Sequence, residues 1–555
     1  MMKERNIIGS FSMQIENIQT KPYSDQKPGT SGLRKKTKVF TEQKNYLQNF
    51  VQSLFNVIDA KGKRLVLGGD GRFYNKEAIQ IILKMAIANE AKQVIIGQNG
   101  YLSTPAASVE IRKNKTDGGI ILSASHNPGG INGDFGIKFD GKNGAPAPES
   151  ITNAIYEQTQ KITSYKIAKI ADIDLSKIKT KTFGKTEIAI IDPIKNYADL
   201  MEKLFDFKAI KKLFEKGFSL RYDALNAITG PYAKEIFENR LGAQAGTVVN
   251  GTPLPDFGGG HPDPNLTYAK KLVDFMYSDK ATDMGAASDG DGDRNMVLGK
   301  KFFVNPSDSI AILASYANLT KGYKKSIPGV ARSMPTIRAL DLVAKANKWG
   351  SYEVPTGWKF FGSLMDANRI VFCGEESFGA GSNHIREKDG LWAILFWLNI
   401  LAKTGLSVEQ IVEKFWSDFG RCFYSRYDFE GVESAATKKL MDGLIKKLPE
   451  LKGKTIDGLI IKKADEFSYK DPVTKEKTDH QGIRIFFKSG ERIIFRISGT
   501  GTQGATIRIY FERLVKKRGE IKQDPQKALS KLIKVGLKIS RLPQITGRKE
   551  PSVIT

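Results

Sequence analysis

The chain has 555 residues, 40% hydrophobic and 10% aromatic, which is enough for several packed domains and excludes wholesale disorder. Two cysteines exclude a disulfide framework, and without an apolar leader or a run long enough to cross a bilayer we expect a soluble, cytoplasmic protein. The net charge of +26 is interleaved with acidic residues and lacks nucleic-acid-binding motifs, so it indicates a lysine-rich surface and favours a strongly anionic small substrate.

The N-terminal region alternates strands and helices. Short apolar runs predict strands, and apolar residues at helical spacing between two of them predict a helix, so this βαβ pattern predicts a mixed or parallel sheet flanked by helices. The predicted strands are 65–67, 94–96 and 120–122, and the helix carries Ile79, Ile82, Leu83 and Ala86 on one face. Another helix is expected to start near 103–105.

The next two regions repeat this pattern. The lysine-rich stretch 161–185 indicates an exposed connection, after which we expect a second unit that opens with the strand 188–191. Its other elements are strands 218–222 and 247–249, a helix with Tyr197, Leu200, Met201 and Leu204, a helix from Pro231 and a strand ending at Ala287. A third unit from about Asn305 has strands 330–332, 352–354 and 370–373 and a helix over 336–346.

The C-terminal region differs from the other three. Helices at 435–447 and 525–540 and strands at 483–487, 492–497 and 506–510 predict an α+β unit with an antiparallel sheet. We therefore expect an α/β protein of three similar domains and a fourth, different one, with boundaries 1–199, 200–304, 305–425 and 426–555.

A loop of unusual composition follows the strand 120–122. It reads Ser123-Ala124-Ser125-His126-Asn127-Pro128-Gly129-Gly130, in which the proline and two glycines turn the chain sharply. A serine next to a histidine at a strand end is a candidate nucleophile or phosphoserine, although a solvated turn serine is the commoner meaning of such a pair.

Three aspartates alternate with glycines in Asp289-Gly290-Asp291-Gly292-Asp293-Arg294. Carboxylates this close repel one another unless a cation lies among them, and oxygen ligands suit magnesium or calcium. An EF-hand loop does not fit, because Arg294 replaces its glycine and Lys300 its closing glutamate. The triplet therefore predicts a metal site with open positions for a phosphate oxygen.

The segment 496–504, Arg-Ile-Ser-Gly-Thr-Gly-Thr-Gln-Gly, lies between two predicted strands. Its glycines expose backbone N–H groups, and its hydroxyls together with Arg496 and Arg508 add donors and positive charge, which indicates a phosphate cradle rather than a P-loop. Glu375, Ser377 and the pair Thr356-Gly357 follow other strands and could hold sugar hydroxyls.

Taken together, these segments resemble the eukaryotic phosphoglucomutases of the α-D-phosphohexomutase superfamily, from about Thr20 to Thr555. The markers are 27–34, 125–130, 289–294, 374–377 with 384–390, and 496–508. The resemblance implies four domains around a central cleft, the last with a TATA-binding-protein-like fold. It also implies the parafusin-like branch as one candidate within the family.

The resemblance implies a role for each matching residue. Ser125 would carry the transferable phosphoryl group and, with Asp289, Asp291 and Asp293, bind Mg²⁺. Charged positions associated with catalysis would be Arg34, His126, Lys138, Arg294 and Lys388. Sugar would be bound by Thr356, Gly357, Glu375 and Ser377, and the phosphate by Arg496, Ser498, Gly499, Thr500, Gly501 and Arg508.

The implied reaction interconverts glucose 1-phosphate and glucose 6-phosphate through a phosphoserine and glucose 1,6-bisphosphate, which also serves as activator. Lys388 and His126 are both candidates for the base. The implied partners are sugar phosphates, with no nucleic acid and no membrane insertion, and the chain would be a monomer or weak dimer. A mannose-specific mutase and a parafusin- or aciculin-like scaffold with peripheral vesicle association are the alternatives.

Two departures from the family pattern stand out. Ser123 replaces a usual threonine, so a second serine lies in the loop of Ser125. The segment Gly259-Gly260-His261-Pro262-Asp263-Pro264 has one histidine where the family has two. Neither departure changes a charged catalytic position.

Overall fold

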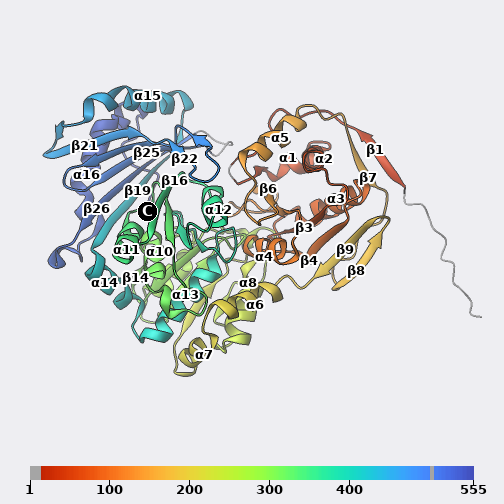
Figure 1. Cartoon of the computed structure of the whole chain (residues 1–555), viewed down its shortest axis with the longest axis horizontal. Helices are drawn as coiled ribbons and strands as arrows, with labels where there is room; N and C mark the ends of the chain where they lie inside the picture. Colours follow the sequence, from red (N-terminus) through yellow and green to blue (C-terminus); the bar gives the residue numbers. More distant parts are fainter. Residues whose placement is uncertain (1–13, 30, 500–504) are drawn as a thin grey trace, which may run out of the picture. The chain divides into compact units, whose positions relative to one another are not determined.

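The computed structural model describes residues 14–29, 31–499 and 505–555. The chain folds into two compact units (Figure 1). Unit 1 comprises Met1–Ala124 and Gly129–Asn196, and unit 2 comprises Ser125–Pro128 and Tyr197–Thr555. The short stretch around Ser125 therefore belongs with the C-terminal part of the chain.

Unit 1 is built on a mixed seven-stranded sheet, as predicted. The sheet order is β2 (Leu33–Lys36), β6 (Asp134–Gly141), β5 (Gly118–Leu122), β3 (Arg64–Gly69), β4 (Gln93–Tyr101), β9 (Thr186–Ile191) and β8 (Lys179–Phe183). The four strands from β5 to β9 run parallel, and the flanking pairs are antiparallel. The Ser125 loop follows β5, the outermost of the four parallel strands on the side of β6.

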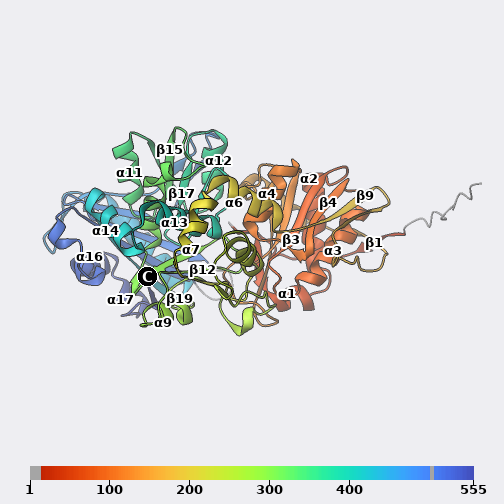
Figure 2. The same ribbon diagram turned by 90° about the horizontal axis from the view of Figure 1, so that it is seen from below.

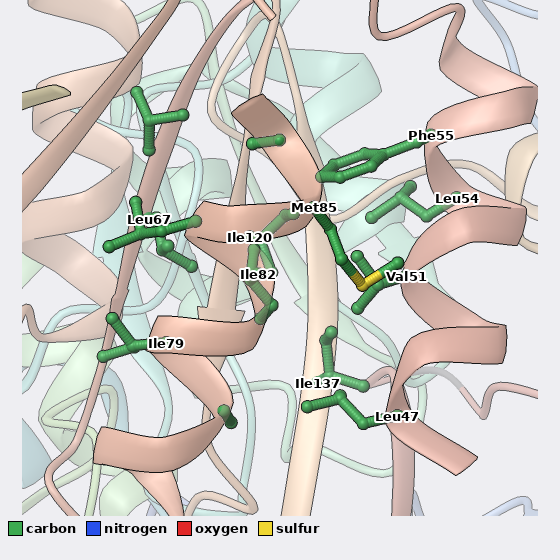
Figure 3. Packing of buried hydrophobic residues seen from close by; sticks show 14 of the residues in the cluster. Leu47, Val51, Leu54, Phe55, Leu67, Ile79, Ile82, Met85, Ile120 and Ile137 are labelled. Atoms are coloured by element: carbon green, nitrogen blue, oxygen red, sulfur yellow. The ribbon is translucent and has the colours of Figure 1, made fainter. Parts of the chain in front are cut away.

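Helices cover both faces of this sheet. On one face, α2 (Tyr46–Ile58) and α3 (Asn75–Ala88) bury apolar side chains against β3, β5 and β6, which Figure 3 shows. On the other face lies α4 (Thr104–Asn114), because a side chain at Gly119 of β5 would meet Ile111 of that helix. The helix α4 begins where predicted, with the Ser103 hydroxyl accepting a hydrogen bond from the Ala106 amide. The remaining helices of unit 1 are α1 (Thr37–Glu42) and α5 (Glu149–Thr159).

Two predictions about the segment 161–191 are wrong. The strand 188–191 does not open a second unit, because it is part of β9, which pairs in parallel with β4 of the first sheet. The lysine-rich stretch is not simply a connection either: it contains β8 and β7 (Ser164–Ala168), which pairs with β1 (Ile15–Gln19). Strand β8 is mostly exposed at the sheet edge, where lysines discourage pairing with other chains, so its sequence looks like a solvated linker.

Unit 2 contains two further mixed sheets (Figures 1 and 2). One has the order β11 (Val248–Val249), β10 (Leu220–Asp223), β12 (Met284–Ser288), β13 (Asn295–Gly299), β14 (Phe302–Phe303), and the other β16 (Gly350–Val354), β15 (Gly329–Ser333), β17 (Phe372–Gly374), β18 (Ala380–Ser382). Their helices are α6 (Lys195–Leu204), α7 (Phe207–Glu215), α8 (Thr229–Ala233), α9 (Lys270–Met276), α10 (Pro306–Ser315), α11 (Ala339–Asn347), α12 (Lys359–Asp366), α13 (Gly390–Thr404) and α14 (Val408–Phe419). The helix α13 is apolar on all sides and buried beside β12, β13 and β18.

The C-terminal sheet of unit 2 is wholly antiparallel, as predicted. Its order is β20 (Thr455–Ile456), β21 (Leu459–Glu466), β24 (Ile483–Phe487), β25 (Arg492–Gly499), β26 (Ala505–Val515), β19 (Arg421–Val432) and β27 (Val553–Ile554). The helices α15 (Ser434–Leu451) and α16 (Pro525–Ser540) pack on it, and a side chain at Gly536 of α16 would meet Phe511 and Ile493. Because side chains alternate between the two faces of a strand, the neighbours of Phe511 and Ile493 in sequence lie on the opposite face of the sheet, away from α16.

The predicted fold class is confirmed, with three regions of mixed sheet and helices followed by an antiparallel α+β region. The predicted boundaries between the four domains stay predictions; that at 199/200 falls inside α6, and β19 begins at Arg421. The predicted central cleft would involve both units and also stays a prediction. Within the described chain no single helix is long and apolar enough to cross a bilayer, and α13 and α14 qualify only as a pair bent by 85°.

Candidate active site

Ser125 is held in an unusual backbone conformation. Its φ of +52° lies in the left-handed region, which serine seldom adopts, and its side chain is only 2% exposed. The Ser125 hydroxyl donates a hydrogen bond of 2.8 Å to Oδ2 of Asp289, and Nδ1 of His126 lies 3.4 Å from the same Oγ. The serine that the sequence predicted as a nucleophile therefore lies against the first of the three predicted metal ligands.

The three aspartates converge on one point. One carboxylate oxygen each from Asp289, Asp291 and Asp293 lies within 4.8 Å of the other two, and all three side chains are buried. Burial and the neighbouring charges of Asp293 and Asp291 raise the pKa of Asp289 well above its ordinary value. Such mutual repulsion is what a bound cation would relieve.

The donor set fits a hard divalent cation. Within the described residues, the buried Oδ1 of Asp293 accepts no hydrogen bond, so this oxygen has a lone pair for another ligand. Three carboxylates supply oxygen atoms only, which suits Mg²⁺ or Ca²⁺ and not the softer metals. The hydroxyl of Ser125 next to Asp289 adds a fourth oxygen at the same place.

Two cations balance this carboxylate cluster. The backbone N–H of Arg294 donates to Oδ1 of Asp289, and its guanidinium pairs with Asp263 at 3.1 Å. The Lys388 ammonium pairs with Oδ2 of Asp293 at 2.9 Å. Burial works against both positive charges, but the surrounding carboxylates, Asp263 for Arg294 and Asp293 for Lys388, outweigh it and raise both pKa values.

The predicted sugar-binding residues lie next to this cluster. Glu375 accepts a hydrogen bond from the Gly357 amide at 3.2 Å, and burial raises the pKa of its carboxyl despite the nearby Lys388. Thr356 has a buried hydroxyl without a hydrogen-bond partner in the described chain. Glu375 therefore lies between a predicted sugar-binding loop and a predicted catalytic lysine.

The segment after Lys388 is anchored by a buried hydrogen-bond network that sequence reasoning missed. The Asp389 carboxylate accepts hydrogen bonds from the Tyr197 hydroxyl at 2.5 Å and from the Trp392 amide at the start of α13, and it pairs with Nε2 of His384 at 2.9 Å. The other ring nitrogen of His384 lies 2.7 Å from the Ser382 hydroxyl. These contacts fix the backbone on which Lys388 approaches Asp293.

The predicted phosphate cradle is described in part. Arg496 and Arg508 are directly opposite each other on β25 and β26, as are Ser498 and Thr506. Residues that face each other across an antiparallel pair share one side of the sheet. The predicted residues Thr500 and Gly501 lie outside the described residues, and of Gly499 only its place at the end of β25 is described.

A cavity of about 610 Å³ connects several of these residues within unit 2. His126 and Arg294 line it near the aspartates, Ser377 lies on its wall, and Arg508 comes from the C-terminal sheet. A volume of this size accommodates a small-molecule ligand. Four of the predicted functional segments therefore contribute to the wall of one space within unit 2, and a stacked pair formed by His261 and Tyr268 also lines it.

Arg34 and Lys138 are placed in unit 1. Arg34 on β2 is opposite Gly136 on β6, and Lys138 is two residues further along, so both side chains are on the same face of the sheet. Ser123 is also in unit 1, where its buried hydroxyl donates to Asp70 at 2.6 Å. The carboxylate of Asp70 pairs with the buried Arg72, so the second serine of the loop takes part in a structural network.

Sequence reasoning missed several residues besides Tyr197 and Asp389. Asp263, which orients Arg294, lies in the segment that was noted for its missing histidine but given no role. Arg426 and Asp428 also line the cavity. Their spacing of two along a strand, which places both on one face, was the feature of the sequence that could have indicated them.

Comparison with known proteins agrees with this architecture. Four family models match the chain: domain I (25–166), domain II (195–301) and domain III (305–419) of the phosphoglucomutase/phosphomannomutase alpha/beta/alpha domains, and the phosphoglucomutase-1 C-terminal domain (421–552). The phosphoglucomutase of Rhizobium radiobacter is 55% identical over 542 residues, which cover 98% of this chain and 100% of that protein. The probable cytoplasmic phosphoglucomutase 1 of Arabidopsis thaliana is 50% identical, with 98% and 100% covered.

A solved structure is similar over almost the whole chain. The open form of the exocytosis-sensitive phosphoprotein pp63/parafusin from Paramecium, itself described as a phosphoglucomutase, superposes with a TM-score of 0.90 at 49% identity and covers 98% of this chain and 99% of its own. Relatives named as mutases over the full length favour catalysis over the scaffold alternative. The chain therefore belongs to the phosphoglucomutase/phosphomannomutase family, and the predicted intramolecular phosphotransferase is confirmed.

Proposed function

We propose that this chain interconverts α-D-glucose 1-phosphate and glucose 6-phosphate, with Ser125 as the residue that carries the phosphoryl group. The observation that supports this most directly is the 2.8 Å hydrogen bond between the Ser125 hydroxyl and Asp289, within a cluster of three buried carboxylates. A phosphoryl group in transfer needs a nucleophile in line with it and positive charge beside it. A hydroxyl oxygen next to a cation site meets both needs.

The phosphorylated Ser125 would donate its group to the free hydroxyl of the sugar, which gives glucose 1,6-bisphosphate. The bisphosphate would turn over in the site and return its other phosphoryl group to Ser125. Glu375, beside Gly357 and Lys388, would accept hydrogen bonds from the sugar hydroxyls in both orientations. The C-terminal cradle around Arg496 and Arg508 would hold the phosphate that is not transferred.

The metal we propose is Mg²⁺, bound by Asp289, Asp291, Asp293 and an oxygen on Ser125. When bound, it would neutralise charge on the transferring phosphoryl group. Arg294 and Lys388, paired with Asp263 and Asp293, would supply positive charge from the protein itself. Arg34 and Lys138 are proposed for the same role, because they present their cations from one face of unit 1.

Two residues are candidates for accepting the proton of the attacking hydroxyl, and the ion pair with Asp293 that raises the pKa of Lys388 favours His126. His126 has Nδ1 3.4 Å from the Ser125 hydroxyl, and Lys388 lies beside Glu375 at the sugar-binding loops. Substitution of each by a residue that cannot titrate, His126→Gln and Lys388→Met, distinguishes them. Loss of the base removes one limb of the dependence of kcat on pH, whereas loss of a charge that only binds substrate raises KM.

The test of the reaction is a coupled assay for glucose 6-phosphate formed from glucose 1-phosphate with Mg²⁺ and catalytic glucose 1,6-bisphosphate. Ser125→Ala should abolish turnover and the phosphorylated peptide in mass spectra. The matched control is Ser123→Ala, two residues away, whose hydroxyl contacts Asp70 and should not be needed for phosphoryl transfer. Normal turnover by the Ser125 variant would reject the assignment.

Replacement of glucose 1-phosphate by mannose 1-phosphate in the same assay tests the mannose-specific alternative. We propose a cytoplasmic protein that works alone or as a weak dimer on sugar phosphates. Cell fractionation and sedimentation of the purified chain test these two points.

A further inference from the structure

The face of the C-terminal sheet that is turned away from α16 carries a row of charged side chains. Across the three neighbouring strands β25, β26 and β19, Arg496 is opposite Arg508, and Arg508 is opposite Asp428. Arg426 is two residues before Asp428 on β19, so it shares this face. Three arginines and one aspartate therefore share one side of the sheet.

Asp428 pairs with two of these arginines at once. Its Oδ1 lies 2.9 Å from Nε of Arg426 and its Oδ2 lies 3.4 Å from Nε of Arg508, and its own side chain is only 4% exposed. Both ion pairs use the Nε edge of the guanidinium. Within the described residues, the buried Nε of Arg426 and that of Arg508 lie at ion-pair distance from Asp428 but make no hydrogen bond, so both guanidinium groups keep N–H donors for a ligand.

Charge also favours an anion at this place. The acidic groups that act on Arg426 are Asp428 and Glu376, and Glu376 lies within 3.3 Å of the hydroxyls of Ser333 and Thr336. The side chains that line the 610 Å³ cavity include four arginines and three carboxylates, which leaves an excess of positive charge in a partly buried setting, where electrostatic attraction is stronger than in water; they are Arg294, Arg426, Arg508 and Arg548, and Asp263, Asp428 and Glu430.

The same two arginines line the 610 Å³ cavity that also contains His126, Arg294 and Ser377. Arg426 has its side chain 13% exposed and Arg508 27%, so both are largely desolvated and still reach the cavity. Planar guanidinium groups that line the same space suit the oxygens of a phosphate, which they can bind in pairs.

We propose that Arg426 is a further phosphate-binding residue, which, held in place by Asp428, forms a clamp with Arg508 for the phosphate that is not being transferred. The clamp rests on the proposed function only for the identity of its natural ligand, a sugar phosphate. The clamp consists of two guanidinium groups held by one carboxylate. For binding it requires only that the ligand is a tetrahedral oxyanion. Arg426 thereby adds a contact that the loop 496–508 does not include.

Inorganic phosphate tests the clamp without turnover. Phosphate that binds the folded chain raises its thermal midpoint with a saturation curve that gives the dissociation constant. Arg426→Gln should weaken phosphate binding about tenfold or more, because charge-assisted hydrogen bonds are lost, and Arg426→Lys should weaken it less, because the charge stays but the fork is lost. The control Lys488→Gln removes one exposed positive charge from the end of β24, outside the cavity, and should bind phosphate as the original chain does.

If the Gln variant loses its fold because Asp428 is left buried beside one arginine, the Lys variant decides. Phosphate affinity unchanged in both folded variants, or reduced equally in Lys488→Gln, would overturn the clamp. Kinetics separate this from the proposed function. A chain that never turns over glucose 1-phosphate but binds phosphate through Arg426 would reject the function and keep the clamp, and normal KM in the Arg426 variants of an active chain would reject the clamp alone.

Discussion

A buried carboxyl in α10 makes the stability of unit 2 depend on pH. Asp308 is 2% exposed, accepts a hydrogen bond from Nε1 of Trp416, and has its pKa raised by burial from 3.8 to about 6, although Arg421 opposes the shift. Because the folded chain binds this proton more tightly than the unfolded chain, the free energy of unfolding falls as the pH rises from about 4 to about 6. The rise in pKa corresponds to about 3 kcal/mol of the free energy of unfolding, and all of this contribution is lost above pH 6.

Asp308→Asn should remove this dependence. The amide is neutral at every pH, and its oxygen can still accept the hydrogen bond from Trp416, so the variant should be more stable than the original chain by up to about 3 kcal/mol near neutral pH and similar to it at pH 4. All five tryptophans, at 349, 358, 392, 397 and 416, belong to unit 2, so their fluorescence during urea denaturation at several pH values reports on this unit.

The matched control for this experiment is Asp279→Asn, whose carboxylate is 97% exposed and should show no such effect. An equal difference in stability between the original chain and Asp308→Asn at pH 4 and pH 7.5 would exclude Asp308 as the source of the pH dependence. If Asp279→Asn changed the stability with pH in the same way, a general change in net charge would explain both results.

Three further predictions concern the site. Gly390→Ala should lower both the thermal midpoint and kcat, because its Cβ would lie 2.1 Å from the Arg294 carbonyl oxygen. The control Gly443→Ala, with open space around it in α15, should stabilise the chain by about 1 kcal/mol. Equal effects in the two variants would contradict this prediction. Asp389→Asn should destabilise the chain by about 1–3 kcal/mol and lower kcat by displacing Lys388, and an unchanged kcat would argue against a positioning role. Chelation of Mg²⁺ should lower the thermal midpoint of the original chain but not of Asp291→Asn, and a shift of equal size in both would exclude the carboxylate cluster as the metal site.

Local patterns predicted most of the fold. The helix expected over 525–540 has those bounds, and the helices near 79–86 and 103–105 are present, because amphipathic spacing and capping residues act within a few positions. The error at 188–191 has a different origin. Whether a strand joins the preceding or the following sheet depends on pairing with β4, about a hundred residues earlier, and no local feature records that partner.

The candidate site shows the same division. The triplet Asp289, Asp291 and Asp293 could be recognised because its three carboxylates are neighbours in sequence, and the structure brings them together. The contact of Tyr197 with Asp389 joins residues 192 positions apart, and no local pattern pairs the two, although Asp389 lies in the marker segment 384–390. Side chains that carry the chemistry therefore stand out in the sequence more clearly than side chains that position them.

The conformation of Ser125 indicates why so many supporting contacts surround the site. A left-handed serine and three buried carboxylates each destabilise the folded chain by about 1 kcal/mol or more, and such features persist only where the surrounding structure imposes them. Here the aspartate loop is tied to the 388–390 segment by the Gly390 amide, which donates to the Gly292 carbonyl, and by the ion pair of Lys388 with Asp293. That segment is in turn fixed by Asp389 to α13, an apolar helix in the core of unit 2. The rigidity that holds the carboxylates together against their repulsion therefore originates in hydrophobic packing, and a cation would add to it only when bound.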